Sequence, residues 1–80
     1  MAESESIELR LKVDRKFLED LQERVHASKP TEVIRWALGV YDWATEEVSE
    51  GRTVLSLDKS GSDPERLHAP EFSTIKKSAA

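Results

Sequence analysis

Residues 7–13, IELRLKV, alternate apolar and polar side chains without a break. Because successive side chains of a β-strand point to opposite faces, this pattern predicts a strand with one apolar and one polar face. A strand is not stable alone, since its backbone N–H and C=O groups need a second strand to bond with. The first constraint on the fold is therefore which strand pairs with residues 7–13.

The length of the chain also indicates that it needs a partner to be stable. A chain of 80 residues buries only about 60% of the surface that its unfolded form exposes, so its own core is marginal. Cysteine is absent, which excludes disulfides, and the two histidines, His26 and His68, lie too far apart in sequence to suggest a metal site. Oligomerisation is the remaining common way to complete such a core.

Two helices are predicted after the strand. Asp14 is a good N-cap, and apolar residues at helical spacing follow it, which predicts a first helix from about Arg15 to His26. Pro30 suits the first turn of a second helix, from about Thr31 to Ser49, with Ser28 or Lys29 as its cap. Gly51 then provides a C-terminal stop. The predicted fold class is mainly α with one N-terminal β-strand.

The second predicted helix is apolar around more than half of its circumference. A helix of this kind must pack on two sides, and we expect these to be the first helix and the same helix of a second copy. With the apolar face of the strand, this defines a predicted dimer core that consists of Ile7, Leu9, Leu11, Val13, Val33, Trp36, Ala37, Val40 and Trp43. The alternative for Trp36, Val40 and Trp43 is a surface that stacks on bases.

Residues 7–51 form the predicted domain, and the chain before and after them is mostly polar. Residues 1–6 are expected to be a disordered lead-in. In the extension 52–80, residues 53–57 suggest a short strand and SGSDP a turn, and the remainder is expected to have little structure of its own. Its scattered apolar side chains are candidates for binding a partner: Val54, Leu55, Leu57, Leu67, Phe72 and Ile75.

The order of strand, helix, short turn and longer helix over residues 7–48 resembles the ribbon-helix-helix family of bacterial DNA-binding proteins. The motifs IELRLKV, DRKFLEDL and SKPTEVIRWAL carry the resemblance. It implies an intertwined homodimer in which residues 7–13 of two copies pair antiparallel, and this two-stranded ribbon enters the major groove of double-stranded DNA. The second copy would thus supply the missing strand.

The resemblance also implies which residues contact DNA. The outward residues of the strand, Glu8, Arg10 and Lys12, would face base edges, and the alternative for Glu8 is an ion pair with Arg10. The start of the second helix would bind a phosphate through its backbone N–H groups. Side chains or backbone groups of four residues belong to this expected phosphate site: Ser28, Lys29, Thr31 and Glu32.

Three functions compete at this point. The first is a sequence-specific transcriptional repressor that acts as a homodimer, with tandem dimers on its operator. The second is an antitoxin whose extension binds a toxin protein while the N-terminal domain represses its own operon. The third is a monomeric interaction module in which residues 53–57 pair with residues 7–13.

Other classes have little support in the sequence. No nucleophile with a base, paired carboxylates or Gly-rich phosphate loop can be assembled, so we expect neither an enzyme nor a cofactor. The start MAESESIELR does not resemble a signal peptide, and no apolar run approaches the length of a membrane span. We expect a cytoplasmic, nucleoid-associated protein that does not bind membranes.

Overall fold

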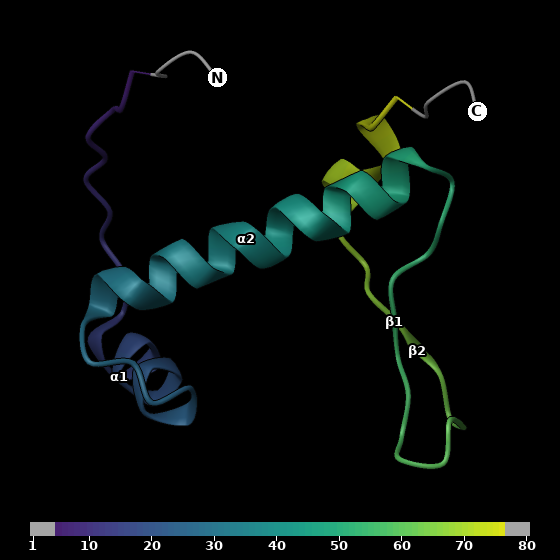
Figure 1. Cartoon of the computed structure of the whole chain (residues 1–80), viewed down its shortest axis with the longest axis horizontal. Coiled ribbons are helices and arrows are strands. Elements are labelled where there is room, and N and C mark those ends of the chain that lie inside the picture. Colours follow the sequence, from purple (N-terminus) through teal and green to yellow (C-terminus); the bar gives the residue numbers. More distant parts are fainter. Residues whose placement is uncertain (1–4, 77–80) are drawn as a thin grey trace. The chain divides into compact units, whose positions relative to one another are not determined.

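The computed structural model describes residues 5–76 of the chain, so residues 1–4 of the expected lead-in and 77–80 of the extension lie outside the described part. The elements, in chain order, are α1 (Arg15–Arg24), α2 (Pro30–Ser49), β1 (Leu55–Ser56), β2 (Glu65–Arg66) and the 3-10 helix η1 (Pro70–Thr74) (Figure 1). The chain divides into two compact units, Met1–Val33 and Ile34–Ala80. The prediction of a mainly helical protein is confirmed.

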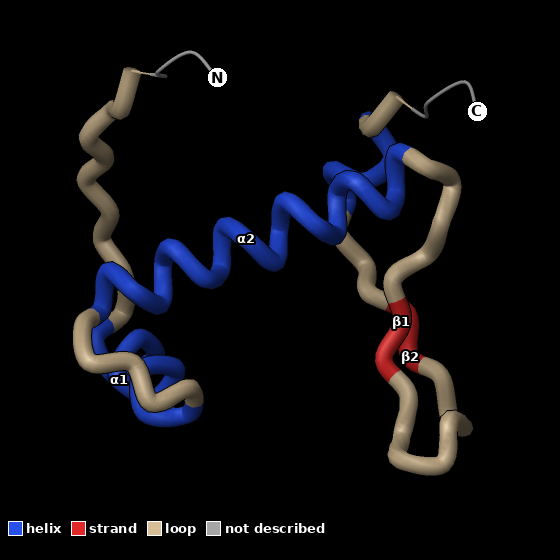
Figure 2. Tube along the Cα trace, in the orientation of Figure 1, coloured by secondary structure: helices blue, strands red, loops and turns tan. Residues whose placement is uncertain are grey.

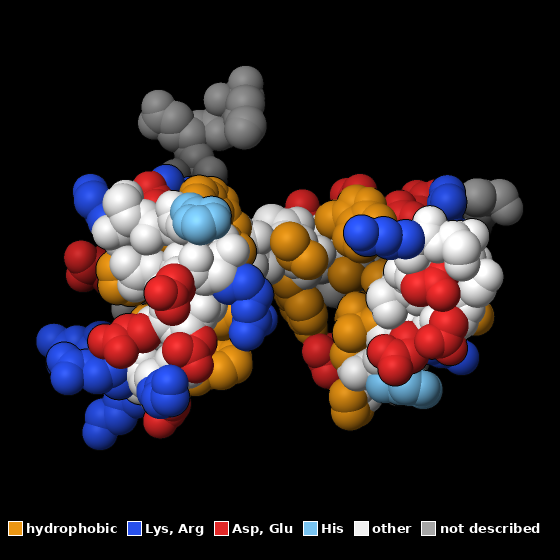
Figure 3. All heavy atoms as spheres, turned by 90° about the horizontal axis from the view of Figure 1, so that it is seen from below, with side chains coloured by type: hydrophobic (Ala, Val, Ile, Leu, Met, Phe, Trp, Pro, Cys, Tyr) orange, Lys and Arg blue, Asp and Glu red, His pale blue; other side chains and the backbone are white. Residues whose placement is uncertain are grey.

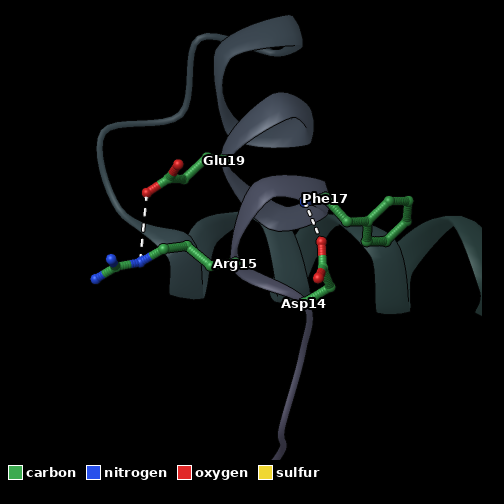
Figure 4. Close-up of polar contacts among 4 residues, drawn as sticks. All are labelled: Asp14, Arg15, Phe17 and Glu19. Carbon is green, nitrogen blue, oxygen red and sulfur yellow. Dashed lines mark hydrogen bonds and ion pairs between the residues drawn. The ribbon is translucent and has the colours of Figure 1, made fainter.

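Helix α1 begins and ends at recognisable caps. The Asp14 carboxylate accepts a hydrogen bond of 2.9 Å from the backbone N–H of Phe17, which confirms Asp14 as the N-cap (Figure 4). After Arg24 the chain turns with His26 in the left-handed region at φ 58°, where the His26 N–H donates to the Glu23 carbonyl. The N–H of the next residue, Ala27, donates to the Gln22 carbonyl at 2.9 Å, which completes a Schellman motif. The helix therefore ends two residues before the predicted end at His26.

Helix α2 ends in the same way. Pro30 is its first residue, one position before the predicted start, and Ser49 is its last. Gly51 adopts φ 84°, its N–H donates to the Val48 carbonyl at 3.0 Å, and the Arg52 N–H donates to the Glu47 carbonyl at 2.9 Å. Because glycine carries no Cβ, it takes this left-handed conformation without strain, and the predicted stop at Gly51 is confirmed.

The predicted N-terminal strand is wrong for the single chain. Residues 5–14 form no helix or strand (Figure 2), and the sheet consists of β1 and β2, which both follow α1 and α2. The physical reason is that a strand needs a second strand to bond with. Among residues 5–76, no strand pairs with residues 7–13. The strand pairing that the third function assumed is also wrong, because Leu55 and Ser56 pair with Arg66 and Glu65 and not with residues 7–13.

The extension has more structure than predicted. β1 and β2 form an antiparallel hairpin, continued by a bond of 2.9 Å from the Leu67 N–H to the Val54 carbonyl. The turn signal lies in its loop, where Oδ1 of Asp58 accepts from the N–H of Ser62 at 2.7 Å, the Ser60 N–H at 3.1 Å and the Ser60 hydroxyl at 2.8 Å. These bonds lower the pKa of Asp58, the Ser62 backbone bond most of all.

The buried core of the single chain is small. Ala27 and Val33 are buried in the unit Met1–Val33, and Ala44 is buried in the unit Ile34–Ala80. Many larger apolar side chains stay exposed, among them Ile7, Leu9, Leu11, Phe17, Trp36, Leu38, Val40, Tyr41, Trp43, Leu55, Leu57 and Leu67. The core of the described residues therefore consists of small side chains alone.

Candidate nucleic-acid interface

The segment of residues 7–13 exposes both of its predicted faces. Ile7, Leu9 and Leu11 keep 77%, 68% and 61% of their surface accessible. The polar residues between them, including Arg10 and Lys12, are exposed as well. In the single chain these residues therefore form neither the predicted dimer core nor a base-reading ribbon, but none of them is occupied by contacts that would prevent either role.

Helix α1 follows this segment directly, because the residue after the segment, Asp14, is the helix cap. Its first two basic residues pair with acids one turn later: Arg15 with Glu19 at 3.8 Å (Figure 4), and Lys16 with Asp20 at 3.5 Å. Figure 3 shows Lys and Arg side chains next to Asp and Glu side chains over this part of the molecule. The positive charges of Arg15 and Lys16 are thus partly neutralised by acidic residues of α1 itself.

The start of α2 differs from the expected phosphate site. The Glu32 carboxylate accepts from the Ser28 N–H at 2.9 Å and from the Ser28 hydroxyl at 3.2 Å. The Glu32 N–H, predicted to point at a phosphate, donates to the Lys29 carbonyl at 3.1 Å. Two members of the predicted site therefore bond to each other, in an arrangement similar to a capping box, while Lys29 and Thr31 remain exposed.

The residues predicted for the dimer core fall into two groups in α2. Val33 is buried within the single chain, so it does not need a second copy to be covered. Trp36, Val40 and Trp43 keep 46%, 64% and 53% of their surface accessible, and Ala37 is also exposed. The stripe that the sequence singled out is available on the helix surface.

A contact that the sequence did not predict ties η1 to α2 within the unit Ile34–Ala80. The Tyr41 hydroxyl donates a hydrogen bond of 2.7 Å to the Glu71 carboxylate. This bond lowers the pKa of Glu71 and, with smaller effects of desolvation and of the negative charge, raises the pKa of Tyr41. Nothing in the local sequence pattern indicates the pair, because its members lie 30 residues apart.

The predicted partner-binding residues of the extension also separate into two groups. Val54, Phe72 and Ile75 are half-buried and border a hollow beside the end of α2, which Val48 and Leu67 also line. Leu55, Leu57 and Leu67 keep 50%, 55% and 46% of their surface accessible. The first group helps to fold the extension, whereas the second is exposed on and beside the hairpin.

Comparisons with protein-family models, curated proteins and solved structures found no match for the chain. Over residues 5–76, no three His, Asp or Glu side chains are grouped closely enough to hold a metal ion. Neither α1 nor α2 has the length and apolar character required to cross a bilayer.

Proposed function

We propose that this protein is a homodimeric DNA-binding regulator that represses transcription by placing residues 7–13 of both copies in the major groove. One observation carries the proposal: an alternating segment with the residue pattern of a strand is exposed on both faces and lacks a strand partner among the described residues. The segment needs a strand to bond with and a cover for its apolar face. A second copy of the same segment provides both, because it supplies backbone hydrogen bonds and covers Ile7, Leu9 and Leu11.

Covering the apolar face presents the polar face. Arg10 and Lys12 then lie on the outside of a two-stranded ribbon, a shape that the major groove admits. Their side chains suit the O6 and N7 acceptors of guanine, and the Glu8 carboxylate suits the N4 amine of cytosine. The Asp14 cap supports this arrangement, because it starts α1 immediately after the ribbon and so limits the freedom of the segment.

The charge of the chain sets how such a regulator behaves. The net charge of −4 disfavours long-range attraction to DNA, so binding depends on the few basic residues near the contact. One ribbon reads few base pairs, and tandem dimers on neighbouring half-sites would raise the affinity to that of a repressor. Such binding weakens steeply as the salt concentration rises.

The experiment is a mobility shift on the DNA upstream of the protein's own gene, with excess bulk competitor and at two salt concentrations. The double variant Arg10→Ala/Lys12→Ala is compared with Lys59→Ala/Arg66→Ala, which removes the same charge from the hairpin. The loss of each base contact should cost about 1–3 kcal/mol, so the first variant loses the shift and the second retains it. If both variants bind the DNA equally well, the two-stranded ribbon does not recognise its sequence.

A second candidate function, the antitoxin, is favoured by the exposed leucines of the hairpin. Leu55 lies in β1 and Leu57 directly follows it, and both side chains are exposed, so they offer an apolar surface for another protein. The variant Leu55→Thr/Leu57→Thr should lose a copurifying protein partner while its DNA shift persists. A variant that keeps such a partner, or a wild-type protein that copurifies with none when expressed from its own operon, argues against this role.

A further inference from the structure

Helix α2 carries an exposed surface whose residues are arranged symmetrically. We define the tryptophan stripe as Trp36, Gly39, Val40 and Trp43, which fall within an arc of about 100° at helical spacing. The large side chains of the stripe are about half exposed or more. Apart from the neighbouring residues and the backbone of α2 itself, no atom of residues 5–76 lies within 4 Å of the position that a Cβ on Gly39 would occupy. The stripe is therefore open along two turns of the helix.

The spacing of the stripe is the same read in either direction. Trp36 precedes the midpoint between Gly39 and Val40 by the same distance as Trp43 follows it. If two copies of α2 lie antiparallel about a two-fold axis at this midpoint, Trp36 of each copy faces Trp43 of the other, and Val40 of each copy faces Gly39 of the other. Gly39 leaves the space beside the indole rings open, so the rings pack without a competing side chain.

The charges beside the stripe favour the antiparallel direction. Arg35 is the one basic residue of α2, and Asp42 and Glu46 lie on the same flank of the helix further along. In the antiparallel pair, Arg35 lies within two residues, about 3 Å along the axis, of Asp42 and of Glu46 of the second copy. The two-fold axis creates this arrangement twice. A parallel pair, with its two-fold axis along the helices, would instead place the two Arg35 side chains on opposite sides of the interface, where neither faces Asp42 or Glu46 of the other copy.

We infer that the tryptophan stripe is a homodimer interface in which two α2 helices pack antiparallel about the Gly39–Val40 midpoint, with Arg35 of each copy paired to Asp42 of the other. This inference rests on the homodimer of the proposed function and specifies the part of it that α2 contributes. The occupant is a second copy of this chain because both the spacing and the charges of the surface are complementary to themselves.

The test measures the dimer dissociation constant by sedimentation equilibrium of the full chain without DNA, at low salt. Three charge variants are compared with wild type: Arg35→Glu, Asp42→Lys, and the double exchange of both. Lys59→Glu is the matched control, because it makes the same charge change as Arg35→Glu in the hairpin loop. Each single exchange places like charges together twice per dimer, so we expect the dissociation constant to rise about tenfold. The double exchange should return it close to the wild-type value.

Added salt provides a second readout. Because the flanking pairs are exposed, the difference between single variants and wild type should shrink at about 1 M salt, where charges are screened within about 3 Å. A dimer that neither single exchange weakens beyond Lys59→Glu overturns the antiparallel α2 interface and leaves the ribbon homodimer standing. A wild-type chain that stays monomeric at every concentration overturns both. A dimer that responds as expected but does not shift DNA supports this interface and refutes only the proposed function.

Discussion

The hydroxyl of Tyr41 on α2 donates a hydrogen bond of 2.7 Å to Oε2 of Glu71 in η1, 30 residues further along the chain. The contact needs a protonated tyrosine and an ionised glutamate, and it shifts the pKa of each group in the direction that preserves this state. It therefore connects the folding of the extension to two measurable titrations.

Tyr41 is the single tyrosine of the chain, so an ultraviolet titration of phenolate absorbance observes it alone. We expect its pKa to lie above the ordinary value of 10.0, because ionising the phenol removes the bond and places two negative charges together. In the variant Glu71→Gln the pKa should fall towards 10.0. A wild-type value at or below that of the variant would show that the contact does not form in solution.

The same contact gives the extension a defined pH range of stability. The folded pKa of Glu71 is lowered, so the stabilisation is complete above its ordinary pKa of 4.5 and is lost as the pH falls through the folded value. The folded pKa of Tyr41 is raised, so the stabilisation is complete below 10.0 and is lost as the pH rises through the folded value. Between these limits, Tyr41→Phe should increase amide hydrogen exchange in η1, and below the acid limit it should have no effect.

The N-cap of α1 makes a separate prediction about stability. Replacing Asp14 by alanine removes the acceptor for the Phe17 N–H and should lower the free energy of unfolding by about 1 kcal/mol, measured by urea denaturation with circular dichroism. Asp14→Asn keeps an acceptor oxygen and should be nearly neutral. If the alanine and asparagine variants were equally destabilised, the loss would come from charge and not from the capping bond.

The C-terminal ends of α1 and α2 have different residues at the same cap position. Exchanging the residue type at each end should therefore change the free energy of unfolding in opposite directions. His26 and Gly51 both occupy the left-handed position of a Schellman motif, at φ 58° and φ 84°. A residue with a Cβ is disfavoured there by about 1–2 kcal/mol relative to glycine. His26→Gly should therefore stabilise the protein by about 1 kcal/mol and Gly51→Ala should destabilise it by a similar amount, measured as in the Asp14 experiment. Destabilisation by His26→Gly would mean that the imidazole makes a compensating contact.

The sequence predicts the features that depend on neighbouring residues. The expected bounds of helix α2 lie within one residue of the observed ones, because Pro30 and Gly51 act locally. The Asp14 cap is predictable for the same reason. The pairing of β1 with β2 and the Tyr41 to Glu71 bond are not predictable in this way, because each joins residues that no periodic pattern relates.

In the candidate interface, the local sequence pattern predicts structure that the single chain does not form. The alternation in residues 7–13 describes what the segment would do beside a partner, whereas the single chain contains none among its described residues, so the predicted strand is missing. At the start of α2, Ser28 and Glu32 fit both a phosphate site and a cap. The second requires only this chain, and it is the arrangement that forms.

The last prediction separates positioning from reading in the proposed complex with DNA. Lys29 is exposed at the start of α2, where binding to a phosphate would add affinity without sequence information, whereas Arg10 would bind a base edge. Binding is measured over a series of salt concentrations, on the operator and on a site with a changed guanine. Lys29→Ala should weaken both DNAs alike and reduce the salt slope by about 1 for each phosphate that the lysine neutralises. Arg10→Ala should weaken the operator far more than the changed site, because only the operator holds the base that it reads. If the two variants weaken both DNAs to the same extent, the segment of residues 7–13 binds the DNA backbone and does not read its sequence.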